Sequence, residues 1–281
     1  MTVEDFKRIF WLEFIHRLWG RTIGVVFFVP FLWFLVKGKI DRPLAARCGV
    51  LFVLGGLQGV LGWYMVSSGL ESRPDVSQYR LAAHLVSAFV LYAFIVWLAL
   101  DQFRAARGDA PAPAAPALVR LGFLMPPAIL LVVAAGAFVA GLDAGKIYNT
   151  FPLMDGSLTP PDAMSMQPWY MNLFENVGTV QFDHRLLAVS LIALIFRTWA
   201  YGRTRALTPR GRWLLNALAA MVLIQAALGI TTLLLVVPIP IALAHQTGAL
   251  ILFTLGVCFA HEASGVREAS VPKSVAMKPA E

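Results

Sequence analysis

The chain has 281 residues, of which 58% are hydrophobic and only 14% charged, and its mean hydropathy is +0.70. Soluble domains usually carry about 25% charged residues, so a soluble enzyme and a disordered chain are excluded. Two cysteines make no disulfide framework. The composition predicts an all-α polytopic membrane protein. The net charge of +7 would suggest nucleic-acid binding in a soluble protein, so its placement along the chain has to be examined.

Seven stretches are long enough for a spanning helix, which needs roughly 20 mostly apolar residues. The first is the least regular, because its uncharged part is short and contains Pro30. No cleavable signal peptide is expected, because Met1 to Arg8 is polar with no apolar run directly behind it. In chain order, the predicted helices cover residues 14–36, 45–67, 80–100, 120–142, 182–202, 213–237 and 241–260.

The charged residues predict the orientation of these helices. One alternate set of loops, including the C-terminal tail, holds 15 Lys and Arg against 6 Asp and Glu. The other set, including the N-terminal segment, holds 8 Lys and Arg against 10 Asp and Glu. Cytoplasmic loops carry the excess of Lys and Arg, so the first set and the C-terminus are expected inside. The basic charge therefore indicates topology, and a nucleic-acid partner is not expected.

Composition divides the chain into two helical halves. An Ala/Pro-rich linker separates them, and a polar tail follows the second half. The predicted boundaries are 1–103, 104–118 for the linker, 119–262, and 263–281 for the tail. The loop 142–181 is long and rich in proline and aromatic residues, which favours an ordered cap over the outer membrane face.

The two halves repeat the same motifs in the same order. The step from the first histidine to the glutamine is 42 residues in one half and 41 in the other. The repeat predicts a duplicated four-helix bundle with a pseudo-axis along the membrane normal. It also predicts a helix before His16, which this sequence lacks, so either the start is misassigned or truncated or this version has seven helices. The matches are Glu13-Phe14-Ile15-His16-Arg17 with Gln181-Phe182-Asp183-His184-Arg185, Gln58-x-x-Leu61-Gly62 with Gln225-x-x-Leu228-Gly229, and Leu81-Ala82-Ala83-His84 with Leu243-Ala244-His245.

Four of the five histidines, His16, His84, His184 and His245, occupy repeat-matched positions. Each is expected within about five residues of the outer end of its helix, roughly 8 Å along the axis. Two neutral imidazoles from facing helices can bind both axial positions of a haem iron, whereas zinc more often takes three or four ligands with carboxylate or cysteine support. The alternative is that each histidine makes interhelical hydrogen bonds or lies at the interface. His261 has no matched partner and is expected at the inner interface without a role.

The acidic residue differs between the halves. Glu13 shares a helix face with His16, whereas Gln181 takes its place in the second half and cannot ionise. This asymmetry predicts a reactive first half and an electron-transfer second half, unless Glu13 only caps a helix or pairs with Arg17. Arg17 and Arg185 are candidates for binding haem propionates, or else interfacial anchors.

Gln58 and Gln225 lie in the middle of their helices and are interpreted as interhelical hydrogen-bond partners, not ligands.

With these motifs in place, the sequence resembles the haem A synthase family from Phe6 to about His261. The similarity includes the His-Arg and His-Gln-Thr-Gly motifs. Because the outer loops contain no cysteine pair, the sequence resembles the subgroup without that pair, which includes mitochondrial and many proteobacterial forms. Its most specific segments are Glu13 to Arg21, Tyr148 to Gly156, Asn172 to Asn176, Gln181 to Arg185 and His245 to Gly248.

The resemblance implies an eight-helix fold and oxidation of the C8 methyl of haem O to a formyl group, giving haem A for terminal oxidases. By the family pattern, His184 and His245 would hold a haem b cofactor, and His16 and His84 the substrate haem. Glu13 would be the essential acid. The missing first helix would wall the substrate half. The membrane would be the bacterial inner membrane, or the mitochondrial inner membrane in a eukaryote.

Two other classes of function remain open at this stage. A di-haem b-type electron-transfer cytochrome uses the same four histidines without Glu13, and a transporter or structural membrane protein needs no haem. For the synthase, the expected partners are haem O, haem O synthase, an unidentified electron donor and the lipid bilayer. A homo-oligomer is compatible with the sequence.

Overall fold

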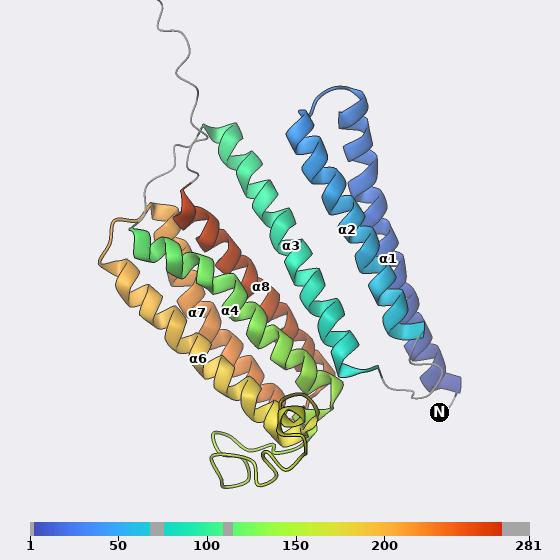
Figure 1. Cartoon of the computed structure of the whole chain (residues 1–281), viewed down its shortest axis with the longest axis vertical. Helices are drawn as coiled ribbons and strands as arrows, with labels where there is room; N and C mark the ends of the chain where they lie inside the picture. Colours follow the sequence, from blue (N-terminus) through green and yellow to red (C-terminus); the bar gives the residue numbers. More distant parts are fainter. Residues whose placement is uncertain (1–2, 68–75, 109–114, 266–281) are drawn as a thin grey trace, which may run out of the picture. The chain divides into compact units, whose positions relative to one another are not determined.

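The computed structural model describes residues 3–67, 76–108 and 115–265. Seven long helices occupy most of these residues, and each is long and apolar enough to cross a membrane. The prediction of an all-α polytopic membrane protein is therefore confirmed. The helices are α1 (Val3–Val36), α2 (Arg42–Ser67), α3 (Gln78–Arg107), α4 (Pro116–Gly141), α6 (Val177–Arg203), α7 (Pro209–Leu234) and α8 (Ile239–Ser264) (Figure 1).

The bounds of several helices differ from the prediction. The start predicted at residue 14 is wrong, because α1 already begins at Val3 and the segment before residue 14 has no Pro or Gly to interrupt it. Pro30 lies inside α1 and removes one backbone donor, which membrane helices tolerate. Helix also covers both ends of the predicted 104–118 linker, since α3 continues to Arg107 and α4 begins at Pro116. Residues 109–114 of the linker and 266–281 of the tail lie outside the described residues.

The backbones of two consecutive helix pairs approach each other most extensively, α1 with α2 and α7 with α8 (Figure 1). The start of α7 shows why the chain turns into a helix at this point. The Thr208 hydroxyl accepts a hydrogen bond from the Gly211 backbone N–H at 2.8 Å, and Pro209 takes the first helical position, where no N–H is needed. In α8 the N-cap is Pro238, and Pro240 takes the second helical position, where again no N–H is needed.

The loop between α4 and α6 is ordered, as predicted. It contains two 3₁₀ turns, Ala144–Lys146 and Trp169–Met171, and the short helix α5 (Asn172–Glu175). The Asn172 amide is fully buried: it accepts from the Met166 N–H at 2.9 Å and donates to the carbonyls of Met166 at 2.9 Å and Trp169 at 2.8 Å. A buried amide satisfied in this way fixes the loop without regular secondary structure.

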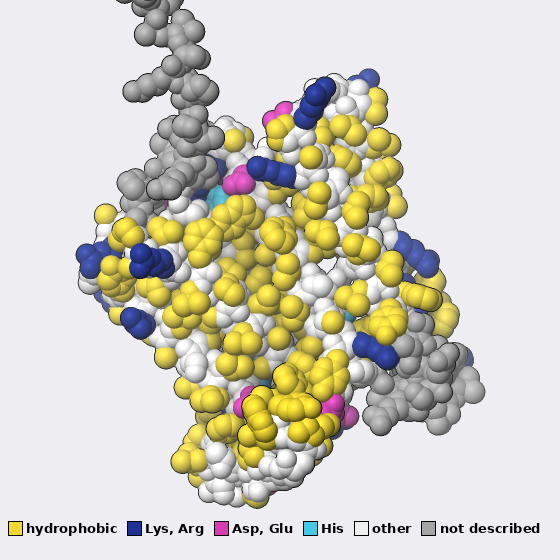
Figure 2. Space-filling model, in the orientation of Figure 1, with side chains coloured by type: hydrophobic (Ala, Val, Ile, Leu, Met, Phe, Trp, Pro, Cys, Tyr) yellow, Lys and Arg dark blue, Asp and Glu magenta, His cyan; other side chains and the backbone are white. Residues whose placement is uncertain are grey.

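Hydrophobic side chains cover most of the face in Figure 2, and charged side chains are sparse on it. Such a surface is what a bilayer requires, because lipid chains satisfy no polar group. The chain forms two compact units. The first comprises residues 1–95, 133–148 and 153–184, and the second 96–132, 149–152 and 185–281, as far as these residues are described.

Candidate functional site

The four repeat-matched histidines lie at nearly the same distance from the start of their apolar spans, although α1 itself begins 13 residues before His16. His16 on α1, His84 on α3 and His245 on α8 each follow the first residue of the apolar span by six positions, and His184 on α6 follows it by seven. At 1.5 Å per residue this is about 9–10 Å, slightly deeper than expected. His16 is exposed, whereas the other three are partly buried.

In the first unit, His84 of α3 lies against two residues of α2. Gln58 Nε2 is 3.1 Å from His84 Nδ1 and donates to the His84 carbonyl oxygen at 2.8 Å. One turn further along α2, the ring lies over Gly62, where a Cβ would come within 2.9 Å of His84 Cε1. The glutamine and the glycine therefore form a slot for the imidazole, the glutamine contacting Nδ1 and the glycine leaving room for the ring.

A hydroxyl completes the arrangement around His84. Ser87 lies one turn after His84 on α3, and its Oγ is 2.7 Å from Gln58 Oε1 and 2.7 Å from the Ala83 carbonyl oxygen. Both ends of the Gln58 amide are thus engaged, its nitrogen by the backbone of His84 and its oxygen by Ser87.

In the second unit, α7 and α8 repeat this slot around His245. Gln225 Nε2 is 3.1 Å from His245 Nδ1 and donates to the His245 carbonyl oxygen at 2.9 Å. A Cβ on Gly229 would come within 2.9 Å of His245 Cε1. The position that matches Ser87 is Gly248, and among the described residues the buried Gln225 Oε1 has no hydrogen-bond partner.

His184 also lies on a glycine. A Cβ on Gly136 of α4 would come within 3.1 Å of His184 Cε1. Three of the four histidines therefore lie directly on the backbone of a neighbouring helix. The prediction from sequence missed Gly136. The repeat could not single it out, because the matched motifs of the second half begin at Gln181, after α4.

These residues fit a haem. Neutral imidazoles are ordinary axial ligands of haem iron, and the glycine-backed slots hold the rings without competing side chains. The Gln225 amide lies against the Nδ1 edge of His245 through its nitrogen, and its buried oxygen has no hydrogen-bond partner in the described part of the chain, so this amide is the group that a metal-bound imidazole would meet with its N–H.

The acidic position differs in its contacts as well as in its chemistry. Glu13 is not a helix cap, because α1 begins ten residues earlier. Its carboxylate forms an ion pair with Arg17, with Arg17 Nε donating at 3.0 Å, and both side chains are more than a third exposed. Gln181 is buried and donates to the carbonyls of Ala144 at 2.8 Å and Ile147 at 2.5 Å. Gln181 thus holds the loop after α4, a contact that Glu13 does not share.

Arg185 follows His184 and also contacts the loop. Its Nη1 donates to the Thr150 carbonyl oxygen at 3.1 Å. The residue before Thr150, Asn149, donates its side-chain N–H to the Leu233 carbonyl oxygen at the end of α7 at 2.8 Å. Asn149 and Thr150 are therefore tied to Arg185 of α6 and to the end of α7, all within the second unit.

The sequence profile of the family described as cytochrome oxidase assembly protein, COX15-CtaA, matches residues 1–257. The chain belongs to the COX15-CtaA family.

Several curated relatives are similar over most of this chain. The "Heme A synthase" of Nitrosospira multiformis is 48% identical over 262 residues, which is 93% of this chain and 74% of the relative. That of Nitrosomonas eutropha is 49% identical over 261 residues, 92% of this chain and 73% of the relative. "Heme A synthase COX15" of Arabidopsis thaliana is 42% identical over 276 residues, 93% of this chain and 59% of the relative.

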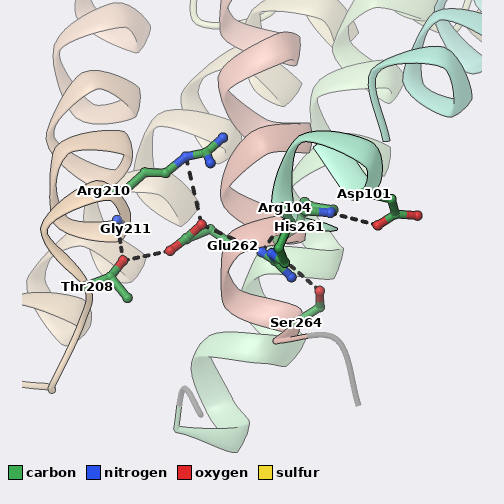
Figure 3. A network of polar contacts seen from close by, with 8 residues as sticks. All are labelled: Asp101, Arg104, Thr208, Arg210, Gly211, His261, Glu262 and Ser264. Carbon is green, nitrogen blue, oxygen red and sulfur yellow. Dashed lines mark hydrogen bonds and ion pairs between the residues drawn. The ribbon is translucent and has the colours of Figure 1, made fainter. Parts of the chain in front are cut away.

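This COX15-CtaA chain contains a polar cluster outside the four histidines, and it corrects the expectation for His261. The residue is buried, with 1% of its surface exposed, and it has polar partners on another helix where no contact was expected. Its Nε2 is 2.9 Å from Asp101 Oδ1, and Arg104 Nη2 is 3.2 Å from its Nδ1 (Figure 3). Both partners lie on α3, three residues apart and therefore on one face of the helix. Neither belongs to a motif that the two halves share, so the sequence did not single them out.

Glu262 continues this cluster toward α7. It accepts a hydrogen bond from the Thr208 hydroxyl at 2.7 Å, and its Oε2 is 3.7 Å from Arg104 Nη2 and 3.8 Å from Arg210 Nε (Figure 3). The cluster thus connects α3, the start of α7 and the end of α8. Its opposite charges are paired, as buried charges require.

Proposed function

We propose that this chain is a haem A synthase, which oxidises the C8 methyl of haem O to a formyl group by two successive hydroxylations. The geminal diol formed by the second would lose water to give the aldehyde of haem A, for use in terminal oxidases. The observation that carries the proposal is the repeated imidazole slot, Gln58 and Gly62 around His84 and Gln225 and Gly229 around His245. Relatives 48% and 49% identical that are named "Heme A synthase" support the choice of reaction.

Within this proposal, His184 and His245 bind a haem b cofactor and His16 and His84 the substrate haem. Support comes from the glycine-backed rings of His84, His184 and His245 and from the matched positions of all four histidines along their spans. When bound, the cofactor haem supplies one-electron transfer. The protein binds and orients both haems and sets the charges around them.

Glu13 is the proposed catalytic acid. It lies three residues before His16 on α1, so both side chains share a helix face, and Arg17 provides a cation against its carboxylate. Its proposed role is to take up a proton or to stabilise positive charge near the reacting methyl. The guanidinium groups of Arg17 and Arg185 are the proposed partners of haem propionates, which they can bind in bidentate fashion.

We propose a bacterial inner membrane location, or a mitochondrial one in a eukaryote, with the C-terminus cytoplasmic and the haem sites near the outer face. The excess of Lys and Arg in one set of loops supports this orientation. We further propose that haem O synthase supplies the substrate and that a separate protein donates the electrons. The chain is also proposed to form a homo-oligomer.

Haem extraction from the purified chain, followed by chromatography, tests this function against the alternative of a di-haem electron-transfer cytochrome. A synthase should yield haem b together with haem O, haem A or hydroxylated haem O. A carrier should yield haem b alone, and that result would overturn the proposal. A protein without Soret absorbance would contradict both.

A further inference from the structure

The two glutamines contact their histidines in the same unusual way. Each side-chain amide spans two groups of one histidine, the ring Nδ1 and the backbone carbonyl oxygen, with distances of 3.1 and 2.8 Å at His84 and 3.1 and 2.9 Å at His245. A contact to both the ring and the backbone of one residue fixes the rotation of the ring about its side-chain bonds. A single interhelical hydrogen bond does not.

The glycine one turn after each glutamine restricts the same ring from its face. Because the helix backbone at Gly62 and Gly229 lies directly against Cε1, the ring cannot turn toward that helix. Amide and backbone together leave the imidazole one orientation, in which Nδ1 faces the glutamine and Nε2 points away from it. Nε2 is then the nitrogen that is free to meet an iron.

An amide suits this position because it carries a donor and an acceptor. Its NH₂ serves an Nδ1 without hydrogen and the backbone carbonyl of the same histidine. When Nε2 binds a metal, Nδ1 carries the hydrogen, and a half-turn of the amide gives up the backbone bond and presents the oxygen to Nδ1–H. Metal-binding histidines nearly always donate this N–H to an outer partner, which orients the ring and makes it a better ligand.

The residue one turn after each histidine shows how the amide is accommodated. In the first unit Ser87 contacts Gln58 Oε1 at 2.7 Å. In the second unit a Cβ at Gly248 would overlap Gln225 Oε1. The amide of Gln225 therefore occupies the space that a side chain at position 248 would need, and Gly248 is required for it.

We propose that Gln58 and Gln225 are positioning residues that orient the His84 and His245 rings toward iron, and that Gly248 makes room for the Gln225 amide. This inference rests on the proposed function for its ligand, since it assumes that His245 binds haem iron. It adds a role to residues whose sequence pattern indicates only helix packing.

The test compares four variants of the full chain, purified with its haem: Gln225→Leu, Gly248→Ala, Thr232→Val and His245→Ala. The measured quantities are haem b per protein, by the pyridine haemochrome spectrum, and the midpoint reduction potential of that haem. Gly248→Ala is the sharper variant, because it displaces the amide, retains every polar group and adds a residue that favours helix. Thr232→Val is the matched control, since its hydroxyl bonds only its own helix at Leu228.

Gln225→Leu and Gly248→Ala should both bind haem about 10- to 100-fold more weakly. Both should also raise the midpoint potential of the haem that remains, because an imidazole without an Nδ1–H acceptor donates less to ferric iron. Thr232→Val should match the wild type. If His245→Ala loses haem while Gln225→Leu and Gly248→Ala keep the wild-type affinity and potential, the positioning role is wrong. If His245→Ala keeps its haem, the ligand assignment in the proposed function is wrong, and the positioning role with it.

Discussion

Gly62 and His84 are in direct contact between α2 and α3, so close that a Cβ on the glycine would lie 2.9 Å from the imidazole Cε1. The same distance separates a Cβ on Gly229 from His245 Cε1. A glycine in the middle of a helix costs about 1 kcal/mol relative to alanine. Its presence at both positions is explained by the ring that it accommodates.

The first prediction follows from this contact. Gly62→Ala forces the His84 ring to shift, and such overpacking costs about 1–3 kcal/mol. We expect weaker binding of haem O, by at least several-fold, in a titration monitored at the Soret band. Gly59→Ala in the same helix is the control, because no described atom outside the local helix lies within 4 Å of its Cβ position. Equal affinity for the two variants would argue against the slot.

The second prediction concerns Glu13. Glu13→Gln should leave haem content and fold unchanged but abolish haem A formation, because the amide cannot exchange a proton. Its ion pair with Arg17 is largely exposed, so the loss should change the free energy of unfolding by no more than about 1 kcal/mol. Haem chromatography of membranes with matched protein levels measures the product. Haem A at the wild-type level would remove the catalytic role.

The third prediction concerns Gln181, the counterpart of Glu13. Gln181→Leu deletes two hydrogen bonds from a buried side chain to the carbonyls of Ala144 and Ile147, and at about 0.5–1.5 kcal/mol for each bond the loss should be about 1–3 kcal/mol. Gln181→Glu should be worse, since a carboxylate would face two carbonyl oxygens. Thermal unfolding in detergent measures both, with exposed Thr204→Val as control. If Gln181→Glu is as stable as the wild type, the two positions are interchangeable, contrary to the structure.

The fourth prediction concerns the buried pair of His261 and Asp101. Asp101→Leu removes the hydrogen-bond partner of the buried His261 Nε2, and leaving a buried polar group without its partner costs about 1–3 kcal/mol. The folded fraction of the Asp101→Leu variant should bind as much haem per protein as the wild type. Lys146→Met, which removes an ion pair with Asp143 that is more than half exposed, is the control and should lower stability by less than about 1 kcal/mol. A neutral Asp101→Leu would show that the cluster does not stabilise the helices.

Much of this could be predicted from the sequence, because membrane helices and repeats leave strong patterns. Apolar length found all seven spans, and the repeat singled out His84 and His245 together with Gln58 and Gln225. The helix start at Val3 was missed because residues 4–8 are mostly polar and the short apolar run behind them, Ile9 to Leu12, is followed by Glu13, His16, Arg17 and Arg21. His261 was misjudged because its partner Asp101 lies 160 residues away, and nothing in either local sequence relates the two.

The roles of single polar residues were the hardest to predict. Glu13 and Gln181 are matched in sequence, yet one pairs with Arg17 on its own helix and the other holds backbone carbonyls of a loop. Only tertiary contacts distinguish these two uses of one position. The loop around buried Asn172 is a similar case: its order could be expected from its prolines and aromatic residues, but the amide contacts that hold it leave no periodic pattern.

Conversion of haem O into haem A is the reaction that we propose for this chain. The most direct test is to express it in a bacterium that accumulates haem O and has no haem A synthase of its own, and to chromatograph the extracted haems. We expect haem A from the wild-type chain, with hydroxylated haem O as the intermediate. The Glu13→Gln variant should form neither haem A nor hydroxylated haem O. Membranes that contain the folded, haem-loaded protein but only haem b and haem O would contradict it.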